Sequence, residues 1–320
     1  MISLRPQRAV SVVRALASPA SLKGVLSARE AASMLAEGFA RAGVEVEESP
    51  IADGGEGTAD TLGARVLRDV PVQDAFGRPR EAPVWALGDG TLLVQSADAV
   101  PLDPAKLDVV AASSRGFGEL IAAVPECPRL LVGLGGTATM DGGEGLLEVV
   151  SELPAPTTVL CDTRSTLVEA PQRFGPQKGA SPEIVAELEG RFRGRPFAEL
   201  PGSGAAGGLG AALASLGAEL VPGAQFVFEL TGFRERVARA DLVVTGEGTV
   251  DRTTFEGKAP GEAARVCEGL AVRCVLFGGR VADGIDAVAL SGDPGRARQD
   301  LEELGLRLGT AMAEPNVEAT

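Results

Sequence analysis

Residues 133–145 read GLGGTATMDGGEG, and this stretch decides the fold that the sequence predicts. An apolar run at 130–132 precedes it and another at 146–150 follows it, an order that indicates a strand, a glycine loop and a helix. Six of its thirteen residues are glycine, so backbone N–H groups can approach a ligand without a Cβ atom in the way. The sequence therefore predicts a ligand-binding loop after a buried strand.

The last five residues of this stretch, DGGEG at 141–145, repeat residues 53–57 letter for letter. A third glycine loop with acidic residues, GEGTVD, occupies 246–251. Bare backbone donors combined with carboxylates are what a site for phosphate and a divalent cation requires. The alternative interpretation, tight turns with solvated acids, is made less favourable by the repeat.

Both ends of the chain alternate strand and helix patterns around these loops. Ser27 and Glu30 form a capping-box pattern, which predicts a helix that begins there and ends at Gly43. We expect strands at 9–17, 44–51, 242–245, 273–277 and 287–290, and helices at 27–42, 58–66, 259–267 and 297–308. Five such strands suffice for one flavodoxin-like sheet, with ligand groups at the C-terminal ends of its strands.

The middle of the chain has a different pattern. Short alternating strands at 70–74, 82–87 and 91–95 predict an antiparallel meander. A helix at 113–124, a strand at 157–160 and a helix that opens at Ser181 follow. We therefore expect an α/β protein of two domains. Residues 1–66 and 238–320 would form a flavodoxin-like (Rossmann-like) parallel-sheet domain, and residues 67–237 a second α/β domain inserted into it.

Composition excludes several classes of function. The net charge of −14 argues against nucleic-acid binding, which needs a basic face. No apolar run reaches the roughly 18–20 residues that a membrane span needs. Four cysteines without CxxC spacing indicate neither a zinc site nor a disulfide framework, so we expect free thiols in the cytoplasm. Arg14 interrupts the apolar core that an N-terminal signal peptide would need.

The basic residues are unevenly chosen. The chain has no histidine and no tyrosine, so acid–base chemistry falls to Asp, Glu, Lys or Cys. Only four of its 30 basic residues are lysine, and Lys23, Lys178 and Lys258 each adjoin a glycine, whereas Lys106 does not. Lysine binds phosphate as a compact point charge. The three glycine-flanked lysines are therefore candidates for binding a phosphate group, against the alternative of chance placement in turns.

Two stretches match the dinucleotide-binding pattern GxGxxG or its alanine-ended variant, at 202–207 and 133–138. The first follows a charged, proline-containing segment instead of a strand, and neither has an acidic residue at the expected spacing. We therefore do not expect a nicotinamide cofactor. No GxxxxGK[ST] run is present, which excludes a P-loop kinase.

Taken together, these motifs resemble the type I glycerate kinase family over nearly the whole chain. The matching segments are SLKGVLSA (21–28), ADGGEGT (52–58), GLGGTATMDGG (133–143), CD (161–162), FGPQKGA (174–180), GAAGGLGAAL (204–213) and TGEGTVD with GK (245–258). The resemblance implies ATP-dependent phosphorylation of a hydroxyl of D-glycerate with magnesium, in a cleft between two α/β domains. It also implies a small-molecule partner, and it leaves a homodimer open.

The resemblance suggests roles for twelve residues. The expected catalytic residues are Lys23, Asp162 and Lys178, with Asp162 accepting the hydroxyl proton and the lysines binding the transferred phosphoryl group or the substrate carboxylate. The expected nucleotide and phosphate ligands are Gly135, Gly136, Thr137, Gly207, Gly208 and Lys258. The expected magnesium ligands are Glu247, Asp251 and Asp53.

The chain departs from the usual residues of that family at seven motif positions. They are Ala20, Leu22, Gln95, Met140, Ser165, Thr249 and Thr253. These departures motivate a second interpretation, a diverged relative that binds a small hydroxy acid or a nucleotide with weak catalysis or none.

Overall fold

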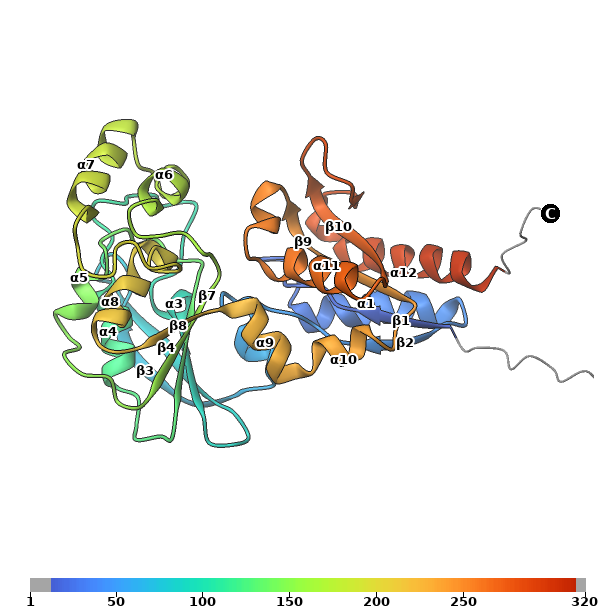
Figure 1. Cartoon of the computed structure of the whole chain (residues 1–320), viewed down its shortest axis with the longest axis horizontal. Helices are drawn as coiled ribbons and strands as arrows, with labels where there is room; N and C mark the ends of the chain where they lie inside the picture. Colours follow the sequence, from blue (N-terminus) through green and yellow to red (C-terminus); the bar gives the residue numbers. More distant parts are fainter. Residues whose placement is uncertain (1–12, 315–320) are drawn as a thin grey trace, which may run out of the picture.

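Two β-sheets organise the part of the chain that this computed structural model describes, residues 13–314 (Figure 1). Each sheet carries helices, and the two lobes they form lie side by side in Figure 1. The predicted α/β class is therefore confirmed. Within residues 13–314, no helix combines the length and the apolar character needed to cross a membrane.

The two ends of the chain share the first sheet. Its five strands are all parallel and lie in the order β11-β10-β9-β1-β2. Their bounds are β1 Arg14–Ala17, β2 Glu45–Glu48, β9 Leu242–Val250, β10 Arg273–Val281 and β11 Val288–Ala289. If these five strands are numbered 1 to 5 along the chain, their order across the sheet, read from β2, is the flavodoxin-like 2-1-3-4-5. That order has its switch point between the first and third strands. Here that point lies between β1 and β9.

Helices cover both faces of this sheet. On one face α1 and α12 pack against Ala17 and Val244, and on the other α9, α10 and α11 pack against Leu16 and Val243. Their bounds are α1 Ala28–Arg41, α9 Gly223–Thr231, α10 Phe233–Val237, α11 Ala259–Gly269 and α12 Ala297–Ala313. The predicted capping box of α1 is present, since Ser27 Oγ accepts from the backbone N–H of Glu30 at 3.2 Å and the Glu30 carboxylate accepts from that of Ser27 at 3.0 Å.

Several boundaries predicted from the sequence are wrong; for example, the strand expected at 273–277 continues to Val281. The strand expected at 242–245 continues through GEGTV to Val250, because Gly246 pairs with Phe277 of β10 and a Cβ on Gly246 would lie 2.2 Å from the Phe277 carbonyl oxygen. The third glycine loop is therefore a strand. The helix expected at 58–66 ends early, as α2 Thr58–Thr61, because Gly63 has a φ of +65° and the next strand begins at Arg65. Of the strand expected at 9–17, residues 9–12 lie outside the described range.

The second sheet has six strands in the order β3-β4-β5-β6-β7-β8. Their bounds are β3 Arg65–Gln73, β4 Pro79–Ala86, β5 Leu92–Gln95, β6 Leu130–Leu134, β7 Thr157–Cys161 and β8 Glu219–Pro222. The first three strands pair antiparallel, as the predicted meander requires, and the last four pair parallel. The helices and helical turns of this half are α3 Ser96–Ala99, α4 Arg115–Ala122, α5 Glu144–Leu147, α6 Ala170–Phe174, η1 Pro176–Lys178, α7 Pro182–Phe192, η2 Ala205–Gly207 and α8 Leu209–Ser215.

Helix α9 lies between the two sheets. Ala224 and Phe228 belong to the core of the first sheet, whereas Phe226 packs against Leu93 and Leu131 of the second. We retain the division into 1–66 with 238–320 and 67–237 as a proposal. The packing of α9 and α10 favours moving its second boundary to about residue 222.

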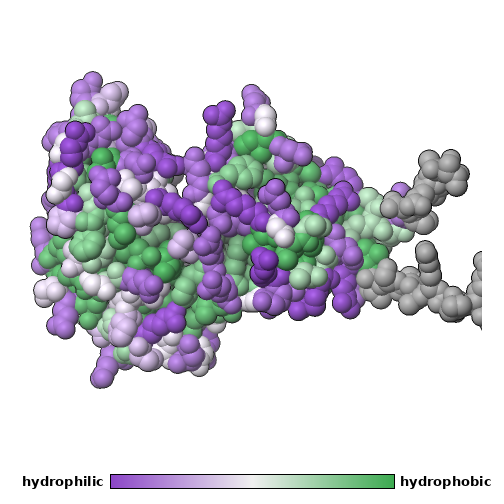
Figure 2. All heavy atoms as spheres, viewed as in Figure 1, coloured by the Kyte–Doolittle hydropathy of each residue, from purple (hydrophilic) through white to green (hydrophobic). Residues whose placement is uncertain are grey.

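Close backbone contacts join the lobes at the first DGGEG loop. A Cβ on Gly54 would lie 2.5 Å from the carbonyl oxygen of Leu160, and one on Gly133 would lie 2.4 Å from that of Gly54. A Cβ on Gly223 would lie 1.9 Å from the carbonyl oxygen of Asp53. These glycines let the loop of one lobe lie directly on the strand ends of the other. Figure 2 shows hydrophilic side chains gathered where the lobes meet on the face in view.

These contacts predict a specific destabilisation. Gly54→Ala adds a Cβ where the Leu160 carbonyl stands, and it also places a side chain at a φ of +95°. Gly63→Ala is the matched control, because its φ is +65° but nothing lies within 4 Å of the added Cβ. We expect the control to cost about 1 kcal/mol and Gly54→Ala to cost about 1–3 kcal/mol more. Thermal unfolding of both variants measures this, and equal midpoints would show that the glycine contact does not constrain the interface.

Candidate active site

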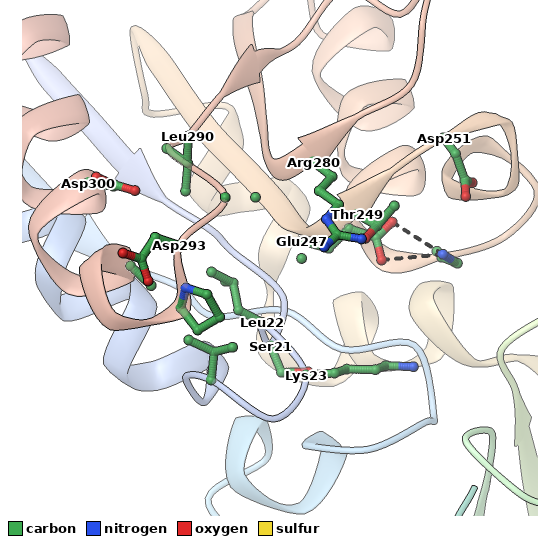
Figure 3. Close-up of a pocket in the computed structure, with 17 residues that line it drawn as sticks. Ser21, Leu22, Lys23, Glu247, Thr249, Asp251, Arg280, Leu290, Asp293 and Asp300 are labelled. Atoms are coloured by element: carbon green, nitrogen blue, oxygen red, sulfur yellow. Dashed lines mark hydrogen bonds and ion pairs between the residues drawn. The ribbon is translucent and has the colours of Figure 1, made fainter. Parts of the chain in front are cut away.

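A pocket of about 380 Å³ opens at the C-terminal edge of the first sheet, beside the switch point between β1 and β9. Lys23 lies in the loop after β1, Glu247 lies in β9, Asp251 directly follows β9, and Lys258 directly precedes α11 (Figure 3). Open parallel sheets bind ligands at this edge, where successive crossover connections diverge to opposite faces. The fold alone therefore places a ligand here.

Lys23 is presented by a tight loop. The backbones of Leu22 and Leu26 bond to each other across it, and Gly24 adopts a φ of +73°. The lysine side chain extends away from Asp293, as Figure 3 shows. Burial alone would lower the pKa of Lys23, but the surrounding carboxylates raise it above the ordinary value; these are Asp53, Asp162, Glu56 and Glu247. Lys23 is therefore a stable cation that is free to meet an anionic ligand.

Asp162 follows directly after β7 and faces Lys23 from the other lobe. Burial and the neighbouring Asp53 raise the pKa of the Asp162 carboxyl to about 7, although the charges of Lys23, Lys178 and Lys258 oppose the shift. Three of the four lysines of the chain thus lie within electrostatic reach of one carboxyl group. A carboxyl with a pKa near neutrality is suited to accept a proton.

The fourth lysine has a different environment. Lys106 lies over the ring of Phe76, with its Nζ 3.9 Å from the ring centroid. No carboxylate or glycine loop of the cleft is among its contacts in the described residues. Glycine neighbours in the sequence therefore distinguished the lysines of the cleft from the one at the surface.

Lys178 lies at the end of η1 and is 5% exposed. Its Nζ donates to the carbonyl oxygen of Thr139 at 2.8 Å and to Thr137 Oγ1 at 3.4 Å. Burial lowers the pKa of Lys178 to about 8, against the opposing charges of Asp162 and Asp141. Two of the three ammonium donors are thus engaged, which leaves one for an anionic ligand.

The predicted glycine loop at 135–137 lies beside Lys178. Gly135 donates its N–H to Ser96 Oγ at 3.2 Å, and a Cβ on Gly135 would lie 2.6 Å from a carboxylate oxygen of Asp162. Gly136 and Thr137 donate their backbone N–H groups to no other group within residues 13–314. The loop therefore offers the N–H groups of Gly136 and Thr137 as free donors close to Lys178. Glycine at position 135 makes room for the Asp162 carboxylate.

Gly207 and Gly208, which were expected to bind phosphate, have a packing role. Their N–H groups already donate to the carbonyl oxygens of Gly204 and Ala205. A Cβ on Gly207 would lie 1.9 Å from the carbonyl oxygen of Thr139. Neither amide is free for a phosphate, contrary to the expectation from the sequence, because the turn at η2 consumes both donors.

The second DGGEG loop is likewise structural. The carboxylate of Asp141 accepts from the N–H and Oγ of Ser114, both at 2.8 Å, and from the N–H groups of Gly143 and Gly145 at 3.0 and 3.2 Å. A Cβ on Gly143 would lie 2.3 Å from that of Ala212 in α8. The repeated sequence therefore builds a turn in both places, but only the copy at 53–57 reaches the cleft.

The three expected magnesium ligands differ in how free they are. Glu247 accepts from Thr254 Oγ1 at 2.7 Å and pairs with Lys258 Nζ at 3.4 Å. Burial raises the pKa of Glu247, and nearby Asp53 raises it further, whereas Lys258 and Thr254 oppose the shift. Asp251 caps η3 Arg252–Phe255, where its Oδ1 accepts from the N–H and Oγ1 of Thr253 at 2.7 and 2.5 Å.

Within residues 13–314, no group of three or more metal-ligating side chains is already assembled. Asp53 lies close enough to affect the pKa values of Lys23, Asp162 and Glu247, and its own Oδ1 accepts from the N–H of Gly55 at 3.1 Å. Glu247, Asp251 and Asp53 are thus separate carboxylates around a pocket that also contains lysines. Such an arrangement suits an ion that takes its other ligands from a phosphate chain and water.

Of the seven departures from the family pattern, Leu22 and Thr249 line the pocket, and Thr253 contacts it through Asp251. Ala20 precedes the lining residue Ser21 and donates its N–H to the carbonyl oxygen of Gly246. Gln95 supports the fold, since it accepts from the N–H of Ala59 at 3.1 Å, and Met140 is fully buried. The lysines and Asp162 are therefore retained in an intact arrangement, which favours a catalyst over a non-catalytic relative.

Sequence reasoning missed the outer part of the pocket. Arg280 on β10, Leu290 after β11, and Asp293, Pro294 and Ala297 before and at the start of α12 all line it. No motif marks these residues, because three separate elements of the C-terminal third bring them together. Their only sequence signal is that they follow strands of the expected sheet.

Comparison with known proteins agrees with this geometry. A family model described as the glycerate kinase family matches residues 15–153 and 151–294. A glycerate kinase of Bacillus subtilis (strain 168) is 32% identical in an alignment that covers 86% of this chain and 87% of the relative. A glycerate 2-kinase of Escherichia coli (strain K12) is also 32% identical, over 85% of this chain and 86% of the relative.

A solved structure shares the fold. The crystal structure of a protein assigned as glycerate kinase 2 from Salmonella typhimurium LT2 matches with a TM-score of 0.71 and 28% identity. The match covers 94% of this chain and 98% of that one. Both lobes are therefore common to the two proteins.

Proposed function

The chain belongs to the glycerate kinase family, and from that membership we propose that it transfers the terminal phosphoryl group of ATP to a hydroxyl of D-glycerate. The kinase class follows from the family, whereas the donor and the acceptor are our proposal. The observation that carries it is that Lys23, Lys178 and Lys258 lie within electrostatic reach of Asp162, with Lys178 bonded to the loop at 137–139 and Gly135 against the Asp162 carboxylate. Phosphoryl transfer needs charge neutralisation and positioning more than covalent chemistry, and this cluster supplies both.

The cluster supports a division of labour. Lys178, with the free N–H groups of Gly136 and Thr137, would hold the carboxylate of the acid, because together they form a cationic donor set. The hydroxyl of the carbon next to that carboxylate would then lie nearest to Asp162, which would take its proton. Lys23 and Lys258 would stabilise the negative charge of the transferred group. The name of the Escherichia coli relative, a 2-kinase, supports the same hydroxyl.

The carboxylates of the pocket fit a divalent cation. Burial and mutual repulsion raise the pKa of Glu247, which a bound cation would reverse. Glu247 and Asp53 would hold magnesium, with the second carboxylate oxygen of Asp251 as a further ligand. A bound magnesium ion would neutralise phosphate charge. Lys258 and Thr254 hold the Glu247 carboxylate in its orientation.

A lysine pair tests this proposal. In a coupled assay with ATP across a panel of short hydroxy acids, we expect turnover to be greatest with D-glycerate. Lys23→Ala should lower kcat/KM by about a hundredfold or more, because a charge aimed at the transferred group is lost. Lys106→Ala is the matched control and should retain wild-type kinetics, since its Nζ lies over the Phe76 ring. Equal kinetics for the two variants would remove the lysine cluster as the basis of catalysis.

Magnesium dependence tests the acidic residues. Glu247→Gln should raise the half-saturating magnesium concentration by about tenfold, which corresponds to a lost ligand worth about 1.4 kcal/mol. Asp251→Asn should raise it less, since one carboxylate oxygen is held by Thr253. Asp251→Ala tests the helix-capping role of Asp251 separately. Unlike Asp251→Asn, it removes the Oδ1 acceptor for Thr253, so it should also lower the thermal midpoint. Superimposable magnesium curves for wild type and Glu247→Gln would place the ion elsewhere.

A further inference from the structure

We propose that the outer end of the pocket binds the purine nucleoside of the phosphoryl donor, so that donor and acceptor occupy different lobes. The inference rests on the proposed function in taking the donor to be ATP. The donor would lie along the C-terminal edge of the five-stranded sheet. The acid would lie on the loop at 135–137 and Lys178 of the other lobe.

The outer end of the pocket has aliphatic side chains from two separate parts of the chain. Leu22 and Val25 form one wall, from the loop after β1, and Leu290, Pro294 and Ala297 form the other, from the end of β11 and the start of α12. Leu22 and Ala297 are buried, whereas Val25 is 37% exposed at the rim. The pocket volume of about 380 Å³ falls within the range of sites that enclose small ligands, about 300–1,000 Å³. A flat aromatic base between aliphatic walls suits this shape.

The charges of the pocket set the direction of the ligand. All three cationic side chains among its lining residues, Lys23, Lys258 and Arg280, belong to its inner and central part, as Figure 3 shows for Lys23 and Arg280. At the outer end the charged lining residues are Asp293 and Asp300. A phosphate chain is attracted to the inner part, where the cations lie, and not to the outer end, where Asp300 pairs with Arg296. Asp300 also accepts from the N–H and Oγ of Ser291, and Asp293 Oδ1 accepts from the N–H of Gly295. The acceptor that matches a ribose hydroxyl is therefore the second carboxylate oxygen of Asp293.

The inner end continues toward the reacting groups. Lys258 directly precedes α11, whose eleven residues begin at Ala259, so the N-terminal end of that helix faces the same region. Lys258 also contributes to the electrostatic environment of Asp162 across the lobes, and a Cβ on Gly257 would lie 3.7 Å from the Asp162 carbonyl oxygen. A donor bound in this direction therefore presents its terminal phosphate to Asp162 and Lys23.

This arrangement reassigns the glycine loop. From the sequence, residues 135–137 were expected to hold nucleotide phosphates, but none of them lines the pocket. They lie instead beside Lys178, on the acceptor side of Asp162. In this arrangement, only residues of the lobe built on the five-stranded sheet bind the nucleotide.

Binding measurements without turnover test the inference. The probes are ADP and inorganic tripolyphosphate, titrated calorimetrically into the full-length protein. Val25→Glu places a carboxylate at the rim of the apolar end, and Val110→Glu makes the same change at a valine that is 73% exposed and lines no part of the pocket. We expect Val25→Glu to weaken ADP by about tenfold or more while tripolyphosphate changes by less than about threefold, because base burial is lost but the phosphate contacts remain. Val110→Glu should bind both probes as the wild type does.

The inner end gives the complementary result. Lys258→Ala should weaken tripolyphosphate and ADP alike, because it removes a phosphate contact. Thermal midpoints of all variants in the absence of ligand show whether each is folded. Unchanged ADP affinity in a folded Val25→Glu variant, or an equal loss of both probes, would overturn the nucleoside subsite.

The two proposals can fail separately. Turnover of D-glycerate with ADP affinity unaffected by Val25→Glu would refute the subsite and keep the function. Selective loss of ADP in Val25→Glu, without turnover of any hydroxy acid, would keep the subsite and refute the function. A wild-type protein that binds neither probe would overturn the subsite outright.

Discussion

A carboxyl group removed from water stays ionised near neutral pH only if cations compensate for the lost hydration. Asp162 is in that position, with burial and Asp53 acting against ionisation and three lysines acting for it. The balance brings its pKa to about 7. The lysines come from three separated loops, so the rest of the structure must hold these loops within electrostatic reach of one side chain. The fold holds the three lysine loops near Asp162.

Two sheets meet the requirement by directing their C-terminal edges toward each other. Lys23 and Lys258 follow from β1 and β9 of the first sheet, while Asp162 follows from β7 of the second. The lobes approach closely because glycine stands at the contact points, where a Cβ on Gly54 or Gly133 would overlap a carbonyl oxygen. At these points glycine is needed for contact between backbones.

The sequence indicated the candidate site better than it indicated the reasons for the glycines. The placement of three lysines beside glycine singled out Lys23, Lys178 and Lys258 as candidates for binding phosphate. The structure places these three within electrostatic reach of Asp162, whereas Lys106 lies over the ring of Phe76. Most strands of the two sheets were predicted because their apolar patterns are local, but β8 Glu219–Pro222 was not. By contrast, GEGTV at 246–250 is a strand and Gly207 is a packing residue, because pairing with β10 and contact with Thr139 decide these cases. The outer wall around Leu290 and Ala297 depends on tertiary contacts alone, so no local pattern could have predicted it.

The pH dependence of kcat/KM for the acid substrate tests the central claim most directly. Asp162 must be deprotonated to accept the hydroxyl proton, and its pKa is about 7, so activity should rise with pH through that value. Lys178 must be protonated to hold the carboxylate, and its pKa is about 8, so activity should fall above that value. The account predicts a narrow bell whose alkaline limb is lost, together with most of the activity, in Lys178→Met. A profile that is flat from about pH 6 to 9, or one whose limbs are unchanged in Lys178→Met, would contradict it.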